Sequence, residues 1–162
     1  MFLTVHASAG IFLGSQLHSP WLAFGLGYFS HLLLDLVPHG DEQLAAKNQY
    51  PETQRKWRLF YLAGLDTLGL ITLFWLLTSS KSVILTPAIL WGMLGAVAPD
   101  YLWGLHKIIP LIILKPIHRL HNWFHHLLNY CLPFPFGIII QLVTLGYFIY
   151  LIIYSPSFLI II

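Results

Sequence analysis

The sequence predicts an all-α, polytopic integral membrane protein folded as a single helical bundle over residues 1–162. Of these residues, 57% are hydrophobic and only 9% are charged, whereas about 25% of the residues in a typical soluble domain are charged. Several apolar segments approach the length of about 20 residues that a helix needs to cross the hydrocarbon core. The net charge of +2 is too small for a nucleic-acid-binding surface. We therefore expect membrane lipid, and no nucleic acid, around this chain.

The first half of the chain contains two short apolar segments followed by a polar loop. We expect a span over residues 2–17 and a second over residues 20–37. Ser19 and Pro20 are typical of an N-cap and a first helical position, and Pro38 is typical of a helix end. Residues 38–56 are polar, so we expect them to form a loop outside the membrane.

The second half of the chain predicts three further spans and one helix at the membrane surface. The spans are expected over residues 57–78, 83–106 and 136–154, and Pro99 is expected to interrupt the second of these. Residues 117–130 mix histidines with aromatic and aliphatic residues, which is typical of an interfacial amphipathic helix.

The basic residues predict the orientation of these five spans. Seven of the eight Lys and Arg residues lie in or beside the segments 38–56 and 106–132, which five spans place on one side. Basic residues in short loops favour the cytoplasmic side. We therefore expect a bacterial or archaeal cytoplasmic-membrane protein, with its N-terminus in the cytoplasm and its C-terminus outside.

Nine histidines exceed the eight Lys and Arg residues, and this topology places eight of them in the cytoplasmic half with every acidic residue. His31 and Asp35 have i, i+4 spacing and share a helix face. That spacing suits two ligands of one metal ion, or a histidine oriented by a carboxylate. Asp66 is expected roughly 13 Å inside its span, where a carboxylate is costly unless it has a role.

Two further patterns support a polar site in the cytoplasmic half. His118, His121 and His125 have i, i+3 and i+7 spacing and therefore share a face of the interfacial helix. His6 lies on a stripe with Gly10 and Gly14, whose small size would let another helix approach closely. Mixed His and Asp ligands suit Zn²⁺, or Mn²⁺ and Fe²⁺ in a two-metal site.

Four short patches carry a resemblance to the YdjM-like group of small membrane-bound metal-dependent hydrolases. Residues 27–35 read G-Y-F-S-H-L-L-L-D, which resembles the group's G-x-x-S-H-x-x-x-D signature. Residues 5–10 resemble its T-H-x-x-x-G element, with Val5 in place of Thr. Residues 95–100 resemble its G-x-x-x-P-D element, which is shared with zinc-dependent phospholipase C, and His118-Arg119 matches the start of an H-R-G-x-T-H block.

The resemblance implies a metal site, and the predicted function follows from it. It implies His6, His31, Asp35 and Asp100 as ligands, with His118 and His39 as helpers. We expect His121 or His125 to act as general acid or base and Asp66 to complete a second site or handle a proton. The predicted function is hydrolysis of an ester or phosphoester in a lipid-like small-molecule substrate at the cytoplasmic leaflet, with Zn²⁺, or else Mn²⁺ or Fe²⁺, as cofactor.

Two other functions are compatible with the same residues. His31 and Asp66 could relay protons or bind a cation in a transporter or channel, although the chain shows no internal repeat. The chain could also be an inactive scaffold. In that case His31 and Asp35 would be a hydrogen-bonded pair, Asp66 a helix-packing carboxylate and Asp100 the N-cap of a resumed helix.

Overall fold

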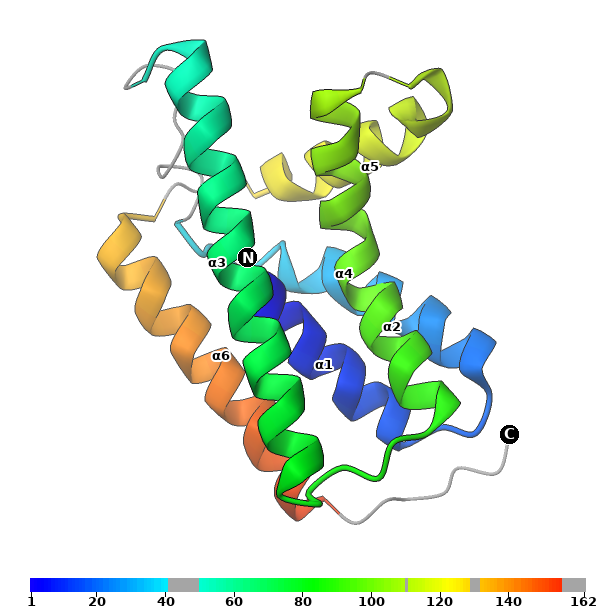
Figure 1. The fold of residues 1–162 in the computed structure, drawn as a ribbon. Helices are drawn as coiled ribbons and strands as arrows, with labels where there is room; N and C mark the ends of the chain where they lie inside the picture. Colours follow the sequence, from blue (N-terminus) through cyan, green and yellow to red (C-terminus); the bar gives the residue numbers. More distant parts are fainter. Residues whose placement is uncertain (41–49, 110, 129–131, 156–162) are drawn as a thin grey trace.

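The computed structural model describes residues 1–40, 50–109, 111–128 and 132–155. These residues form helices and their connections (Figure 1). The helices are α1 (Leu3–Ser15), α2 (Pro20–Leu34), α3 (Glu52–Ser79), α4 (Pro87–Ile108), the 3₁₀ helix η2 (Ile112–Leu114), α5 (Lys115–His126) and α6 (Phe134–Tyr154). The all-helical prediction is confirmed for the described part of the chain.

Three helices, α3, α4 and α6, are long and apolar enough to cross a membrane, and they support membrane association. By contrast, α1 has 13 residues and α2 has 15. At a rise of about 1.5 Å per residue these lengths give roughly 20 and 22 Å, against a hydrocarbon core of about 30 Å. The expected five spans are therefore not confirmed, because the first two helices are too short to cross alone.

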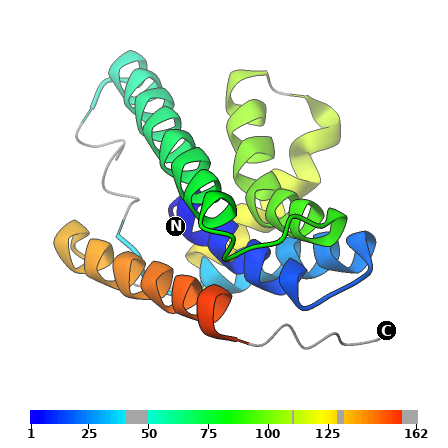
Figure 2. The same ribbon diagram turned by 60° about the horizontal axis from the view of Figure 1, so that its bottom comes forward.

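Helix α1 lies in the middle of the bundle (Figures 1 and 2). It contacts α2 and α4 on one side and α3 and α6 on the other. Its residues from Val5 to Ile11 are all buried, which explains why a short helix with almost no polar face is stable here. The apolar core includes Ile11 together with residues of α3, α4 and α6 and of the segment before α4.

Close contact between α1, α2 and α4 depends on glycine. A Cβ atom built on Gly92 of α4 would overlap the carbonyl oxygen of Gly10 in α1, and one built on Gly27 of α2 would overlap the carbonyl oxygen of Gly92. The predicted close approach beside His6 is thus observed, and α4 is the helix that approaches. This close contact between the backbones of α1, α2 and α4 restricts the positions of the side chains beside it.

Helix α4 continues through Pro99, so the expected interruption is wrong. A proline within a helix removes one hydrogen bond and crowds the carbonyl group four residues earlier. That earlier residue is Gly95. The backbone of α4 at Gly95 lies so close to the backbone of Phe24 in α2 that a Cβ atom on residue 95 would overlap it. Packing against α2 holds α4 together across the lost hydrogen bond.

The outer surfaces of α3 and α6 are apolar. Trp57, Phe60 and Leu68 of α3 are exposed, as are Ile139 and Val143 of α6. Large exposed apolar surfaces are rare on soluble monomers, and they match lipid. Helix α5, by contrast, is a short amphipathic helix that packs beside α4. The last two residues of the interfacial helix expected over 117–130 lie outside the described residues.

Candidate metal centre

The end of α2 places His31 and Asp35 side by side. Asp35 caps the helix, and its backbone N–H donates to the carbonyl oxygen of His31 at 3.0 Å. Both side chains are fully buried, and His31 Nε2 lies 3.0 Å from Asp35 Oδ2. The i, i+4 spacing therefore produces the side-by-side placement that the sequence predicts.

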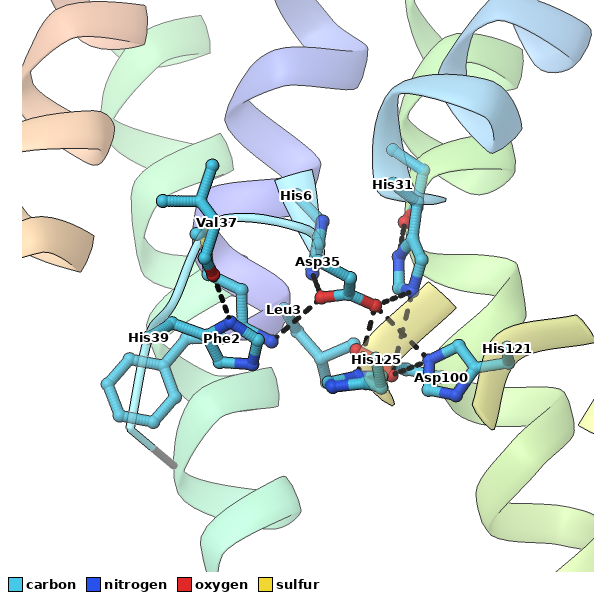
Figure 3. A network of polar contacts seen from close by, with 12 residues as sticks. Phe2, Leu3, His6, His31, Asp35, Val37, His39, Asp100, His121 and His125 are labelled. Atoms are coloured by element: carbon cyan, nitrogen blue, oxygen red, sulfur yellow. Dashed lines mark hydrogen bonds and ion pairs between the residues drawn. The ribbon is translucent and has the colours of Figure 1, made fainter. Parts of the chain in front are cut away.

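The tautomer of His31 is fixed by the backbone of α4. Its Nδ1 lies 2.7 Å from the carbonyl oxygen of Ala96, and a carbonyl oxygen only accepts, so Nδ1 carries the proton. In the neutral ring, Nε2 then presents its lone pair to Asp35 (Figure 3). Metal-binding histidines are commonly oriented by such a bond from the other ring nitrogen.

Asp100 of α4 and His121 of α5 complete a group of four side chains with His31 and Asp35. One ligand atom from each lies within 4.8 Å of the others. His121 Nε2 is 3.3 Å from Asp35 Oδ2 and 3.1 Å from Asp100 Oδ1. His31 Nε2 is 3.7 Å from Asp100 Oδ1. Three different helices therefore supply the four groups.

These distances match a tetrahedral metal site better than a set of hydrogen bonds. With metal–ligand bonds of about 2.0–2.1 Å, two ligands of a tetrahedral zinc ion lie about 3.3–3.4 Å apart. The four nitrogen-to-oxygen distances span 3.0–3.7 Å, whereas charge-assisted N–H···O bonds are about 2.7–2.9 Å long. Within the described residues, His31 Nε2 and Asp35 Oδ2 form no hydrogen bond of acceptable angle.

The number of lone pairs on Asp35 also favours a bound metal ion over hydrogen bonds alone. A carboxylate oxygen offers about two lone-pair positions, yet three imidazole nitrogens lie within 3.3 Å of Asp35 Oδ2. They belong to His31, His121 and His125. One oxygen cannot accept from all three rings, and His31 could donate only as a buried cation. A divalent cation shared by neutral imidazoles removes both conflicts, so the residues present fit a metal ion.

A second group shares Asp35 and could hold another ion. It consists of Asp35, His39 and His125. His39 Nδ1 donates to the carbonyl oxygen of Val37 at 2.7 Å, which leaves the lone pair of the neutral ring on Nε2. His125 Nε2 lies 3.1 Å from Asp35 Oδ2, and the His39 and His125 rings are 5.1 Å apart.

His6 lies against the centre but belongs to neither group of ligand atoms. Its ring is fully buried and stacks on the His31 ring at a centroid distance of 3.9 Å. Its Nε2 is 3.1 Å from Asp35 Oδ1, and the amino group of Met1 is 3.0 Å from the same oxygen. His6 therefore contacts the oxygen of Asp35 that faces away from His31 and His121.

His121 lies on α5, outside the candidate spans. Burial of the ring lowers its pKa, but the hydrogen bond to Asp100 and the nearby Asp35 carboxylate outweigh that effect and raise the pKa above the ordinary value of 6.5. The same carboxylates can bind a metal ion together with the ring nitrogen once that nitrogen has lost its proton.

Asp66 is a residue of α3, and its side chain lies against the first residues of α1. No side chain of α1 itself caps that helix at its start. The Asp66 carboxylate accepts the backbone N–H groups of Leu3 and Thr4, and the Thr4 hydroxyl donates to Oδ1 at 2.6 Å. The first N–H groups of a helix have no partner within the helix, so Asp66 supplies one from α3. The observed contacts are those of a helix-packing carboxylate, with Thr4 as its partner.

His118 also lies outside both ligand groups. It stacks with the Trp103 ring at 6.3 Å and lies beside His106 at 4.8 Å between ring centroids. Burial and the neighbouring Lys107 lower its pKa.

Gln141 is a site residue that the sequence interpretation does not identify. It is buried within α6, accepts the backbone N–H of Phe2 at 2.8 Å, and donates to the carbonyl oxygen of His39 at 3.0 Å. It thus ties α6 to the start of α1 and to the segment that carries His39. A single amide in an otherwise apolar span is the signal that identifies it, since such groups are costly in lipid.

No family model, curated protein or solved structure matches this chain. The YdjM-like resemblance therefore stays a prediction, and the function is inferred from the geometry of the centre.

Proposed function

We propose that this protein is a membrane-embedded metal-dependent hydrolase that cleaves an ester or phosphoester of a lipid-like substrate at the cytoplasmic leaflet. The observation that supports this proposal most directly is the group His31, Asp35, Asp100 and His121, whose separations suit one divalent ion. Two imidazoles and two carboxylates suit Zn²⁺, with Mn²⁺ or Fe²⁺ as other candidates.

One edge of the group is accessible. The side chain of Asp100 is 23% exposed, whereas those of His31 and Asp35 are fully buried. A substrate would therefore approach past Asp100, where α4 and α5 meet. The buried side, lined by α1 and α2, would keep the ligands in place without admitting water.

The proposed roles of the residues follow from these positions. A divalent ion held by these four residues would accept a water as a further ligand, lower the pKa of that water and polarise the ester group of the substrate. His125 has a side-chain exposure of 15%, and its Nε2 lies 3.1 Å from Asp35 Oδ2. We infer that His125 would take a proton at Nε2 and return it to the leaving group, and that Asp35 would stabilise the charged ring.

The test is a hydrolysis assay on the purified full chain, with bis(p-nitrophenyl) phosphate, p-nitrophenyl butyrate and a fluorescent phospholipid as probes. We expect a chelator to abolish hydrolysis and Zn²⁺ or Mn²⁺ to restore it. His125→Gln should lower kcat by about 10²–10⁴-fold while bound metal is retained. His18→Gln, which removes an exposed histidine between α1 and α2, is the matched control.

Two results would count against this proposal. Metal-loaded protein without hydrolysis of any probe would favour an inactive scaffold, and hydrolysis that survives chelation would exclude a metal mechanism. If His125→Gln instead halves the bound metal, His125 is a ligand of a second ion in the group with Asp35 and His39.

A further inference from the structure

Helices α3 and α4 are joined by side chains at one end only. In the second half of α3, Leu70 and Leu73 pack into the same apolar clusters as Met93 of α4. Within the described residues, the backbones of the two helices are nowhere packed against each other, and their ribbons stand apart in both views (Figures 1 and 2). The first half of α3 and the second half of α4 therefore have an open seam between them.

A hydrogen bond between Tyr101 of α4 and Thr67 of α3 separates the packed part from the open part. The Tyr101 hydroxyl lies 2.9 Å from Thr67 Oγ1. The Thr67 hydroxyl donates its single proton to the carbonyl oxygen of Ala63 at 2.7 Å, so Tyr101 is the donor at the contact between the helices. Tyr101 directly follows Asp100, a proposed metal ligand. The open part of the seam therefore begins beside the metal centre.

Two glycines leave space in the open part of the seam. Gly64 lies three residues before Thr67, and Gly104 lies three residues after Tyr101, so each is on the helix face that carries the hydrogen bond. A Cβ atom built on either glycine would meet no described atom within 4 Å. Glycine is unfavourable within a helix, and here no close helix contact requires it. The two glycines keep room between α3 and α4 that helix packing does not use.

The side chains and the length of the open part suit a hydrocarbon chain. Phe60 and Leu105 share the same helix faces and are 66% and 40% exposed. Because α3 and α4 are both long and apolar enough to cross a membrane, these side chains match lipid. From Phe60 to Thr67, α3 advances by roughly 10 Å, against about 30 Å for the hydrocarbon core. A membrane-crossing helix of a partner would need a longer contact, whereas a flexible acyl chain fits a short one.

We propose that the open part of the α3–α4 seam, formed by Phe60, Gly64, Gly104 and Leu105, binds an acyl chain of a membrane lipid. The side chain of Asp100 is 23% exposed, so a chain that ends beside Tyr101 would bring its ester group to the accessible edge of the metal centre. The assignment of that lipid as substrate rests on the proposed function, whereas binding of the chain does not.

The test is photolabelling of the purified full chain in detergent micelles by a phosphatidylcholine with a diazirine on one acyl chain, with labelled residues mapped by mass spectrometry. In the wild type, Phe60 and Leu105 should carry more label than Ile139 of α6, which is 56% exposed. The variant Gly64→Leu/Gly104→Leu should lower the share of label on the seam at least about ten-fold, because excluding two methylene groups loses about that much affinity.

A second pair of glycines provides the matched control. Gly25 of α2 and Gly146 of α6 also lie where an added Cβ atom would meet no described atom within 4 Å. Leucine favours the helix more than glycine does, so both double variants should fold. The control Gly25→Leu/Gly146→Leu should keep the wild-type share of label on the seam.

Two results would overturn the proposal. One is labelling of Phe60 and Leu105 in the wild type that does not exceed labelling of Ile139, since the seam would then be ordinary lipid-facing surface. The other is a dimer in size-exclusion chromatography that Gly64→Leu/Gly104→Leu abolishes, since a second copy would then occupy the seam. Preferential labelling of the seam without hydrolysis of any lipid would support the acyl site and count against the hydrolase function alone.

Discussion

The Asp35 carboxylate contacts more of the polar centre than any other described side chain. His6 lies beside one of its oxygens, and His31, His121 and His125 lie beside the other. Buried charges are stable only when they are paired or coordinated. A residue with this many partners organises the site, whichever ion it holds.

The raised pKa of His121 predicts how metal binding depends on pH. In the metal-free protein, the protonated ring bonded to Asp100 and Asp35 contributes stability that is complete below about pH 6.5 and is lost as pH rises through the raised pKa. Metal binding needs the deprotonated ring. The rise in melting temperature caused by Zn²⁺ should therefore increase as pH rises above about 6.5.

Thermal melting of wild type and His121→Gln, with Zn²⁺ or with a chelator, checks this expectation. In the variant, the metal-free protein should lose less stability as pH rises, and the Zn²⁺-induced shift should shrink. His18→Gln should match the wild type. A Zn²⁺ shift that is independent of pH in the wild type would contradict a role for His121 as ligand.

At the scale of single residues, local spacing predicts more than long-range contact. His31 and Asp35 meet because they are four residues apart in one helix, and a sequence shows this directly. The contact between Asp100 and His121 depends on how α5 folds back onto α4, and the contact of Asp66 with Thr4 depends on how α3 packs on α1. No periodic pattern in the sequence predicts either of these two helix–helix contacts.

At the scale of elements, the contact between α1 and α4 holds the ligands in register. Because a side chain at Gly92 would overlap the backbone of α1, Gly92→Ala should destabilise the protein by about 1–3 kcal/mol and reduce metal retention. Gly104→Ala, in the same helix, meets no atom within 4 Å and should be neutral or stabilising by up to about 1 kcal/mol.

Denaturation in detergent and metal content, measured for both variants, check this prediction. Equal stability of Gly92→Ala and Gly104→Ala would mean that the tight approach of α1 and α4 does not hold the bundle together. Loss of stability in both would mean that α4 tolerates no change, and that the contact with Gly10 has no special role.

At the scale of the whole molecule, the apolar composition predicts helices in a membrane but not how many of them cross it. The segments 2–17 and 20–37 are apolar like the longer ones, yet the helices formed there have only 13 and 15 residues. Burial among neighbouring helices requires apolar residues just as lipid does. Composition alone therefore cannot separate a buried short helix from a span.

Metal binding by the polar centre is the property on which the proposed function depends. Elemental analysis of the purified full chain tests it most directly, with Asp35→Asn and His31→Gln as site variants and His18→Gln as the control. We expect at least about one equivalent of bound metal in the wild type and the control, and a loss of most of it in both site variants. Near-zero metal in the wild type after purification without chelator, or equal metal in all four proteins, would contradict it.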